Sequence, residues 1–225
     1  LDDNLDILYS NASHRQGTFD SIIRYSGIKS GEVLVKKRLG NPLLNGSATA
    51  FRVSPFTTTS TKLFIGTVSG RVLKVENADT ASPTWSAVSP LNWLGSVSSV
   101  SFGANEDEII VTMHNYGVNN IWYTSNGGTS WSMKDGNFPD IPVKAAIMNP
   151  VNNDEVMIGT QLGVWRTSNF KDASPSWTQS FDGMSNVKVT SFSLRTSDNT
   201  VLATTYGRGM FSGQFATGVA SVDDV

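Results

Sequence analysis

Three tryptophans are spaced evenly along the chain, and this spacing constrains the fold more than any other feature. Trp131 follows Trp85 by 46 residues, and Trp177 follows Trp131 by the same interval. A fixed period of this length is typical of repeat architectures, in which each unit buries its apolar surface against its neighbours. We therefore expect successive similar units rather than a β-sandwich, which requires no fixed interval.

Short apolar runs recur at nearly the same interval as the tryptophans. In each unit a first run is followed by a second run, a short loop and a third run. The first runs are residues 51–53, 100–102, 146–148 and 192–194; the second are 63–67, 109–112, 156–160 and 201–205; the third are 72–74, 121–123, 164–166 and 210–212. A fourth strand is expected near each tryptophan, and helical periodicity is missing. This pattern predicts an all-β chain, a β-propeller of four-stranded antiparallel blades.

The repeats divide the chain into three parts. Residues 46–215 are expected to form four repeat blades, residues 1–45 a degenerate or partial blade without its innermost strand, and residues 216–225 a C-terminal tail or linker. About five blades with incomplete ends indicate a fragment of a larger propeller, because ring closure hides the edges of sheets. Open blade edges would then allow self-association, and Leu1 in place of methionine indicates a processed or trimmed chain.

Composition excludes several classes of protein. The 17 Lys and Arg residues against 19 Asp and Glu give a net charge of −2, so no nucleic-acid partner is expected. The absence of cysteine excludes disulfides and thiolate metal sites, and no apolar run reaches the roughly 18 residues that span a bilayer. His14 and His114 lack partners at metal-ligand spacing, so neither a metal nor a cofactor is predicted. The acidic run at residues 106–108 is interpreted as a solvated hairpin.

One segment carries a recognisable motif at the expected junction of a third and a fourth strand. The motif residues within 124–131 are Thr124, Asn126, Gly128 and Trp131. This segment resembles the Asp-box (BNR) repeat of sialidases, sortilin-like receptors and many secreted bacterial propellers. The resemblance implies a structural role, in which the Asn organises its own turn, the Gly permits positive φ and the indole packs between sheets. Two further copies, ending at Trp85 and Trp177, are three residues longer.

A second motif lies near the end of the chain. Residues 203–211 read Ala-Thr-Thr-Tyr-Gly-Arg-Gly-Met-Phe. They resemble the Thr-x-Gly-Arg-Gly segment common in the last blade of secreted bacterial Asp-box propellers. Together the two resemblances cover residues 46–215 and imply a secreted or cell-surface bacterial protein.

Two classes of loop are expected to share the face on which propellers usually bind ligands: the links between blades and the loops between second and third strands. The candidate ligand-binding residues on these loops are Trp93, His114, Tyr116 and Arg208. Asp140 and Asp182 lie one blade apart and form the carboxylate pair that hydrolysis of a glycoside would need. A sialidase would need a cluster of arginines to hold a carboxylate, and this face offers little besides Arg208.

Three functions remain open at this point. The first is a non-catalytic propeller domain that binds carbohydrate or protein through its loop face or acts as a scaffold, because no catalytic set converges. The alternative is part of an Asp-box glycoside hydrolase, similar to oligoxyloglucan hydrolases or sialidases, with Asp140 or Asp182 as acid or base. The third is a propeller that binds another protein, similar to photosystem assembly factors of this superfamily.

Overall fold

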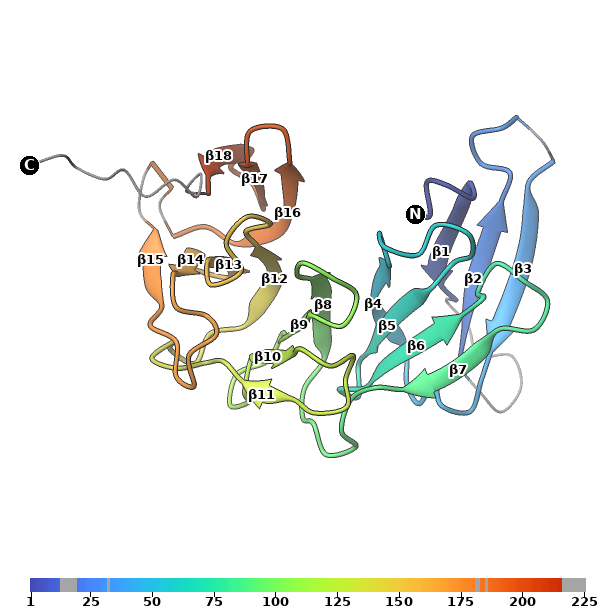
Figure 1. Ribbon diagram of the computed structural model, residues 1–225, viewed down its shortest axis with the longest axis horizontal. Helices are drawn as coiled ribbons and strands as arrows, with labels where there is room; N and C mark the ends of the chain where they lie inside the picture. The colour runs from blue at the N-terminus through green and yellow to red at the C-terminus, as the bar shows by residue number, and fades with distance from the viewer. Residues whose placement is uncertain (13–19, 32, 181–182, 185, 216–225) are drawn as a thin grey trace, which may run out of the picture.

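The chain folds into five antiparallel sheets that stand side by side in an open arc (Figure 1). The computed structural model describes residues 1–12, 20–31, 33–180, 183–184 and 186–215. Within these ranges the chain contains 18 strands and no helix. The sheets follow one another in the order of the chain, and those at the two ends of the arc stand apart in Figure 1.

The three middle sheets each contain four strands, and consecutive strands are neighbours in each sheet. The second sheet contains β4 (Ala48–Val53), β5 (Leu63–Thr67), β6 (Val72–Glu76) and β7 (Thr84–Ala87). The third contains β8 (Val97–Phe102), β9 (Ile109–Met113), β10 (Ile121–Thr124) and β11 (Ser132–Met133). The fourth contains β12 (Val143–Met148), β13 (Val156–Thr160), β14 (Gly163–Thr167) and β15 (Thr178–Ser180). This arrangement confirms the predicted all-β architecture of four-stranded antiparallel blades.

The sheets at the two ends each contain three strands within the described residues. The first contains β1 (Ile7–Asn11), β2 (Ser21–Ser26) and β3 (Val35–Gly40); the fifth contains β16 (Val189–Arg195), β17 (Thr200–Thr205) and β18 (Met210–Gln214). In the first sheet β1 contacts β4, just as β5 contacts β8 in the sheets that follow, so β1 occupies the second-strand position. The predicted tail, residues 216–225, lies outside the described residues.

Apolar cores lie between adjacent sheets, and tryptophans close two of them. The indole Nε1–H of Trp131 donates to the carbonyl of Val88 at 2.8 Å, and that of Trp177 donates to the carbonyl of Lys134 at 2.9 Å. Both carbonyls belong to the segment just beyond the last strand of the preceding sheet. Each indole therefore joins its own sheet to the one before it, as the even spacing predicted.

The innermost strands carry a second connection between sheets. Each of β4, β8, β12 and β16 has a β-bulge near its first residues. At the first two bulges a hydroxyl reaches the next sheet: Thr49 Oγ1 donates to the carbonyl of Val97 and Ser98 Oγ to that of Val143, both at 2.7 Å. The third bulge carries Lys144 in this position. Two of the described inner strands are thus tied directly to their successors.

The interpretation of residues 106–108 as a solvated hairpin is wrong, because both glutamates of this turn contact neighbouring sheets. Glu106 accepts a hydrogen bond from Thr57 Oγ1 at 2.8 Å and also contacts Ser54 and Lys62, all in the second sheet. Charged residues in short turns are usually solvated, but this turn lies where three successive sheets meet. Its acidic side chains therefore supply acceptors to the donors of the adjacent sheet.

Glu108 connects the same turn to the fourth sheet and is only 7% exposed. Its Oε1 accepts from Tyr123 Oη at 2.9 Å and from Lys171 Nζ at 3.2 Å. Its Oε2 accepts from the Ala104 amide at 3.0 Å and from Asn153 Nδ2 at 3.1 Å. Four donors thus compensate for the burial of one carboxylate.

Candidate functional site

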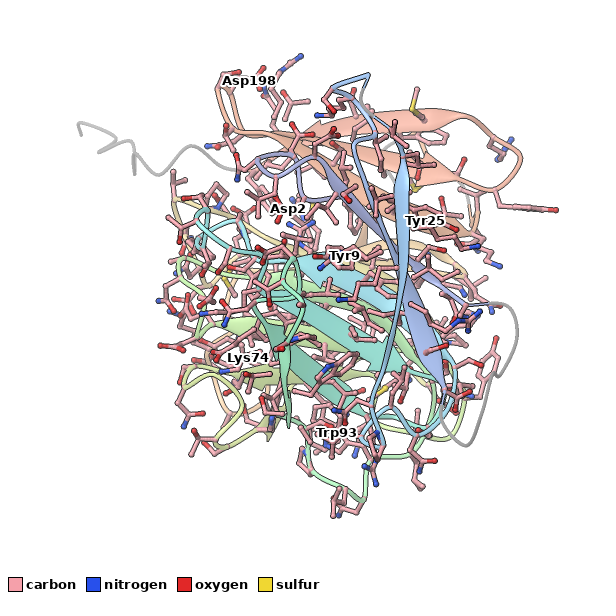
Figure 2. The ribbon with its side chains drawn as sticks, turned by 90° about the vertical axis from the view of Figure 1, so that its right-hand side faces the viewer. Asp2, Tyr9, Tyr25, Lys74, Trp93 and Asp198 are labelled. Carbon is pink, nitrogen blue, oxygen red and sulfur yellow. The ribbon has the colours of Figure 1, made fainter. Side chains whose placement is uncertain are left out.

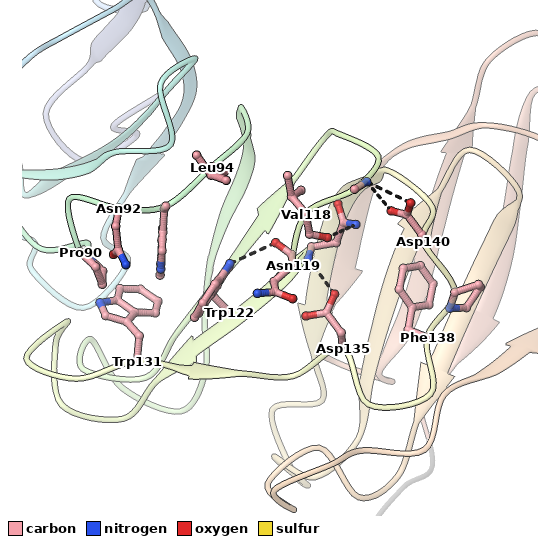
Figure 3. Close-up of a pocket in the computed structure, with 14 residues that line it drawn as sticks. Pro90, Asn92, Leu94, Val118, Asn119, Trp122, Trp131, Asp135, Phe138 and Asp140 are labelled. Carbon is pink, nitrogen blue, oxygen red and sulfur yellow. Dashed lines mark hydrogen bonds between the residues drawn. The ribbon is translucent and has the colours of Figure 1, made fainter.

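An open groove of about 680 Å³ lies beside the third sheet (Figure 3). Three loop segments border it: residues 90–94 between β7 and β8, residues 117–120 between β9 and β10, and residues 135–140 between β11 and β12. Trp122 and Trp131 complete its lining. The groove therefore lies among the two classes of loop on which a ligand site was predicted.

Three indoles form one wall of the groove. The ring of Trp93 stacks on that of Trp122 with centroids 4.7 Å apart, and it meets the edge of Trp131 at 4.9 Å. Trp93 is only 6% exposed, whereas Trp122 and Trp131 are half-buried. The Trp122 Nε1–H donates to the carbonyl of Asn119 at 3.1 Å, which fixes its ring against the 117–120 segment. Trp93 thus contacts both of the other indoles, and the half-buried Trp122 lines the groove (Figure 3).

Two carboxylates lie at the other end of the groove, and both hold the 117–120 segment in place. Asp140 accepts the Gly117 amide on both of its oxygens, at 2.8 and 3.0 Å. Asp135 accepts the Asn120 amide at 2.7 Å and the Ile121 amide at 3.4 Å. Burial raises the pKa of Asp135, and the charge of Asp140 raises it further, against the opposing effect of these amide donors.

The structure brings some of the predicted site residues together and separates others. Trp93 and Asp140 both line the groove, and Tyr116, 62% exposed, lies next to Gly117 at its edge. Arg208 lies in the loop between β17 and β18, two sheets away, and does not line the groove. Asp182, the predicted partner of Asp140, lies outside the described residues. The carboxylate that the structure places with Asp140 is Asp135.

His114 does not line the groove. Its Nδ1 is buried and has no hydrogen-bond partner among the described residues. Burial lowers the pKa of His114 to about 4, and the charges of Lys144 and Lys188 contribute in the same direction. The imidazole is therefore neutral at pH 7 and is placed with the two lysines of the adjacent inner segments.

Trp122, Asn119 and Asp135 are groove residues that were not predicted as ligand-binding. A signal for Trp122 exists in the repeat, because aromatic residues occupy this third-strand position in the third, fourth and fifth units. The link preceding each of those units also carries a large apolar residue. The indole wall forms where the residue of the link and the residue of the third strand meet, so these two recurring positions together are its signal in the sequence.

The segment 124–131 forms a compact turn held by two side chains. Thr124 Oγ1 donates to Asn126 Oδ1 at 2.8 Å and accepts the amides of Asn126 and Gly128 at 3.2 and 3.1 Å. Asn126 Oδ1 also accepts the Ser130 amide at 2.9 Å. Gly128 has a φ of +94°, and a Cβ there would lie 2.6 Å from the Val88 carbonyl oxygen. Glycine is thus required both by the backbone conformation and by close approach to the preceding sheet.

The longer copy of this turn in the fourth sheet reproduces the same contacts. Thr167 Oγ1 donates to Asn169 Oδ1 at 2.8 Å, and that oxygen accepts the Ser176 amide at 2.9 Å. The three additional residues therefore extend the loop without changing its Thr–Asn anchor. Trp177 follows directly and enters the same kind of inter-sheet position as Trp131.

Figure 2 places Trp93 at the opposite end of the molecule from Asp198, which lies in the loop between β16 and β17.

Among the described residues, no three histidine, aspartate or glutamate side chains are grouped as a metal site would require. The same residues include no helix with the length and apolarity to cross a bilayer.

Comparison with known proteins shows the fold. No protein-family model and no curated protein sequence matches the chain. Solved structures do match it. The GH74 enzyme of Niastella koreensis superposes with a TM-score of 0.61 at 17% identity, over 88% of this chain and 32% of that one. The GH74 xyloglucanase of Xanthomonas campestris gives a TM-score of 0.57 at 11% identity, over 92% of this chain and 35% of that one.

A third structural neighbour is described by its own name as a propeller. The β-propeller domain of Cps50 (Swd1) from Myceliophteria thermophila gives a TM-score of 0.58 at 12% identity, over 86% of this chain and 63% of that one. This chain thus spans about a third of the length of the two GH74 chains. At these identities the similarity shows the fold: the five sheets are β-propeller blades.

Proposed function

We propose that this β-propeller is a non-catalytic domain that binds carbohydrate in the groove beside Trp122. The observation that carries the proposal is the combination of a half-buried indole with amide and carboxylate groups in the lining of one open groove. An indole face packs against the apolar face of a sugar ring, and neighbouring polar groups fix the orientation of its hydroxyls. Asn92 and Asn119 supply both donors and acceptors next to the indole wall.

The contacts of the two groove carboxylates support a structural role for them. A glycoside hydrolase requires one carboxyl group to protonate the leaving group and a second to act as nucleophile or base. Asp140 and Asp135 instead use their oxygens to hold three backbone amides of the 117–121 segment. Release of these acceptors to a substrate would leave the amides unpaired, which costs free energy.

We further propose that residues 124–131 are an Asp-box and that the protein is a secreted or cell-surface bacterial protein. The Thr124–Asn126 hydrogen bond, the positive φ of Gly128 and the inter-sheet indole of Trp131 support the Asp-box assignment. The cellular location rests on the resemblance of this turn and of residues 203–211 to segments of exported propellers. No cofactor or metal forms part of this proposal.

The alternative function is glycoside hydrolysis, and two observations favour it. Asp135 has a raised pKa and lines the same groove as Asp140, as a general acid beside a second carboxylate would. Two structural neighbours are GH74 enzymes, one of them a xyloglucanase. Measuring both binding and hydrolysis of a glycan panel separates the two functions. Binding without hydrolysis supports the non-catalytic domain. Hydrolysis that is lost in Asp135→Asn or Asp140→Asn supports the glycoside hydrolase.

Replacing Trp122 with alanine is expected to weaken binding of the recognised glycan at least about tenfold, since a central aromatic contact dominates such an interface. The ligand is first identified on a glycan array and its affinity then measured by titration calorimetry. Trp85→Ala is the matched control, because Trp85 is also half-buried, lies in β7 of the second sheet and does not line the groove. Equal affinities of the two variants, or no glycan binding by the unaltered protein, would contradict the proposal.

A further inference from the structure

Three basic side chains from three successive sheets gather at the inner strands of the arc. His114 follows β9 in the third sheet, Lys144 is the second residue of β12 in the fourth, and Lys188 directly precedes β16 in the fifth. The innermost strands β8, β12 and β16 lie along the concave side of the arc (Figure 1). We call His114, Lys144 and Lys188 the inner basic cluster.

The start of β8 connects the first two members of the cluster. The His114 amide donates to the carbonyl of Ser96 at 2.9 Å. Two residues further along, Ser98 Oγ donates to the carbonyl of Val143 at 2.7 Å, and Lys144 follows Val143 directly. His114 and Lys144 are therefore both attached to the same short stretch of chain, residues 96–98.

The start of β16 brings the third member next to Lys144. Val189 follows Lys188 and packs closely against Gly159, since a Cβ on this glycine would lie 2.6 Å from Val189 Cγ1. Gly159 is the pairing partner of Ala145, the residue after Lys144. The backbone thus places the two lysines on adjacent inner strands at the same level.

Neither lysine of the cluster has an anionic partner among the described residues. Lys188 Nζ lies 5.8 Å from the centre of the Tyr206 ring, and Lys144 has no hydrogen bond or ion pair. Burial and the charge of Lys188 lower the pKa of Lys144, and burial and both lysines lower the pKa of His114. No carboxylate opposes either shift. Like charges held this closely destabilise a folded chain, and a bound anion removes that cost.

The imidazole of His114 adds a neutral donor to the two charges. Within the described chain its Nδ1 is buried and has no hydrogen-bond partner, whereas its Nε2 is not buried. A proton on Nδ1 would be a buried donor without an acceptor, so we assign the proton of the neutral ring to Nε2. The cluster therefore offers two positive charges and one N–H donor.

Lys144 also takes the place of a residue that joins two sheets. At the equivalent bulge positions Thr49 and Ser98 donate their hydroxyls to a carbonyl of the next sheet. Lys144 makes no such bond within the described residues, so the junction of β12 with β16 lacks this connection. A stabilising contact replaced by an unbalanced charge indicates a functional site rather than a structural one.

The repeat assigns the neighbouring undescribed segments to other places. One interval of 46 residues earlier, the counterparts of residues 181–185 are residues 135–139, in the link beside the groove. The counterparts of residues 216–225 are residues 170–179, toward the outer edge of the fourth sheet. The interval thus predicts no side chain from either segment at the inner basic cluster.

We propose that the inner basic cluster binds a tetrahedral dianion, sulfate or phosphate, either free or as an ester. Two ammonium groups balance its two charges, and charge-assisted hydrogen bonds from Lys144, Lys188 and the Nε2–H of His114 satisfy its oxygens. A single carboxylate would leave one positive charge unbalanced. None of the three residues lines the groove beside Trp122, so this site does not depend on the function proposed for that groove.

The test is an NMR titration of the backbone amides with sodium sulfate and with sodium phosphate, at constant ionic strength balanced by chloride. We expect saturable binding of both dianions and weaker binding of acetate. Lys144→Gln and Lys188→Gln should each weaken sulfate binding at least about tenfold, since each removes a charged donor. Lys36→Gln is the matched control, because Lys36 also lies over a tyrosine ring, 5.9 Å from that of Tyr25, in the first sheet. It removes the same charge and should leave the affinity unchanged.

A second measurement follows the imidazole itself. Saturating sulfate should raise the pKa of His114 by at least about 1 relative to chloride, because an adjacent anion favours the imidazolium. Proton NMR measures this pKa, and loss of the signal in His114→Gln assigns it. Absence of saturation by either dianion, acetate binding as tight as sulfate binding, equal effects of Lys36→Gln and Lys144→Gln, or an unchanged pKa of His114 would each overturn the proposal.

The source of the dianion is distinguished by a sugar ester. Galactose 6-sulfate that binds more tightly than inorganic sulfate supports an ester as the ligand, and weaker binding supports the free ion. Both results depend on the inner basic cluster and should be lost together in Lys144→Gln. Binding of a neutral glycan in the groove beside Trp122 is measured separately and is unaffected by any of these outcomes.

Discussion

Replacing Trp177 with alanine is expected to lower the free energy of unfolding by about 3–5 kcal/mol, the usual cost of removing a buried tryptophan. Trp177 is 2% exposed and packs against Phe138 and Phe170 in the core between the third and fourth sheets. The substitution leaves a cavity and removes the donor to the Lys134 carbonyl. Urea unfolding followed by circular dichroism measures the change.

Trp85 is the matched control, because it holds the same repeat position but is half-buried. Trp85→Ala is expected to cost less than half as much, since less apolar surface returns to water. Trp177→Phe separates the two contributions of the indole by keeping a ring and removing the Nε1–H. If Trp85→Ala and Trp177→Ala lower the free energy of unfolding equally, the contribution of these indoles to stability does not depend on their burial, and the prediction is wrong.

Replacing Glu108 with alanine is expected to lower the free energy of unfolding by about 1–3 kcal/mol, because it leaves the Tyr123 hydroxyl and the Ala104 amide without their acceptor. The carboxylate connects the third sheet to Asn153 and Lys171 of the fourth. Glu76 is the control: it pairs with Lys74 at 3.3 Å on the surface, and its replacement should cost less than about 1 kcal/mol. Similar losses for both variants in urea unfolding would contradict a buried bridging role for Glu108.

The same carboxylate predicts a dependence of stability on pH. Burial raises the pKa of Glu108, but hydrogen bonds from the Ala104 amide, Tyr123 and Lys171 outweigh it and hold the pKa below its usual 4.5. Because the pKa of Glu108 is lower in the folded than in the unfolded state, its ionised carboxylate stabilises the fold above about pH 4.5. This stabilisation is lost as the pH falls through the pKa of the folded state. Unfolding free energies measured from pH 6 to pH 3 should therefore decline less steeply in Glu108→Gln than in the unaltered protein.

Much of the fold was predictable because the residues that recur along the sequence are those that pack between sheets. The three tryptophans at 46-residue intervals and the recurring apolar runs occupy positions at which successive blades pack together. The Thr–Asn turn was predictable for the same reason, since the side-chain hydrogen bonds of Thr124 and Asn126 are made within residues 124–130. Such local and repeated requirements leave a clear pattern in a single sequence.

The candidate site was predictable only in part, because it depends on contacts between loops that are not repeated. Asp140 was paired in the prediction with Asp182 on the basis of blade spacing, whereas the structure places Asp135 in its groove. Spacing assigns a loop to a face of the propeller, but it does not determine how far from the axis a side chain lies. His114 and Arg208 were thus assigned to the right class of loop and still lie outside the groove.

The hydroxyl contacts of the innermost strands bear on how the molecule unfolds. Thr49 and Ser98 each donate to a carbonyl of the next innermost strand, and neither hydroxyl reaches a sheet further along the arc. In such a linear array a unit at either terminus has one stabilising neighbour, and an internal unit has two. The first and fifth sheets should therefore unfold before the middle ones. Protection of backbone amides against hydrogen exchange should then be highest in the third sheet.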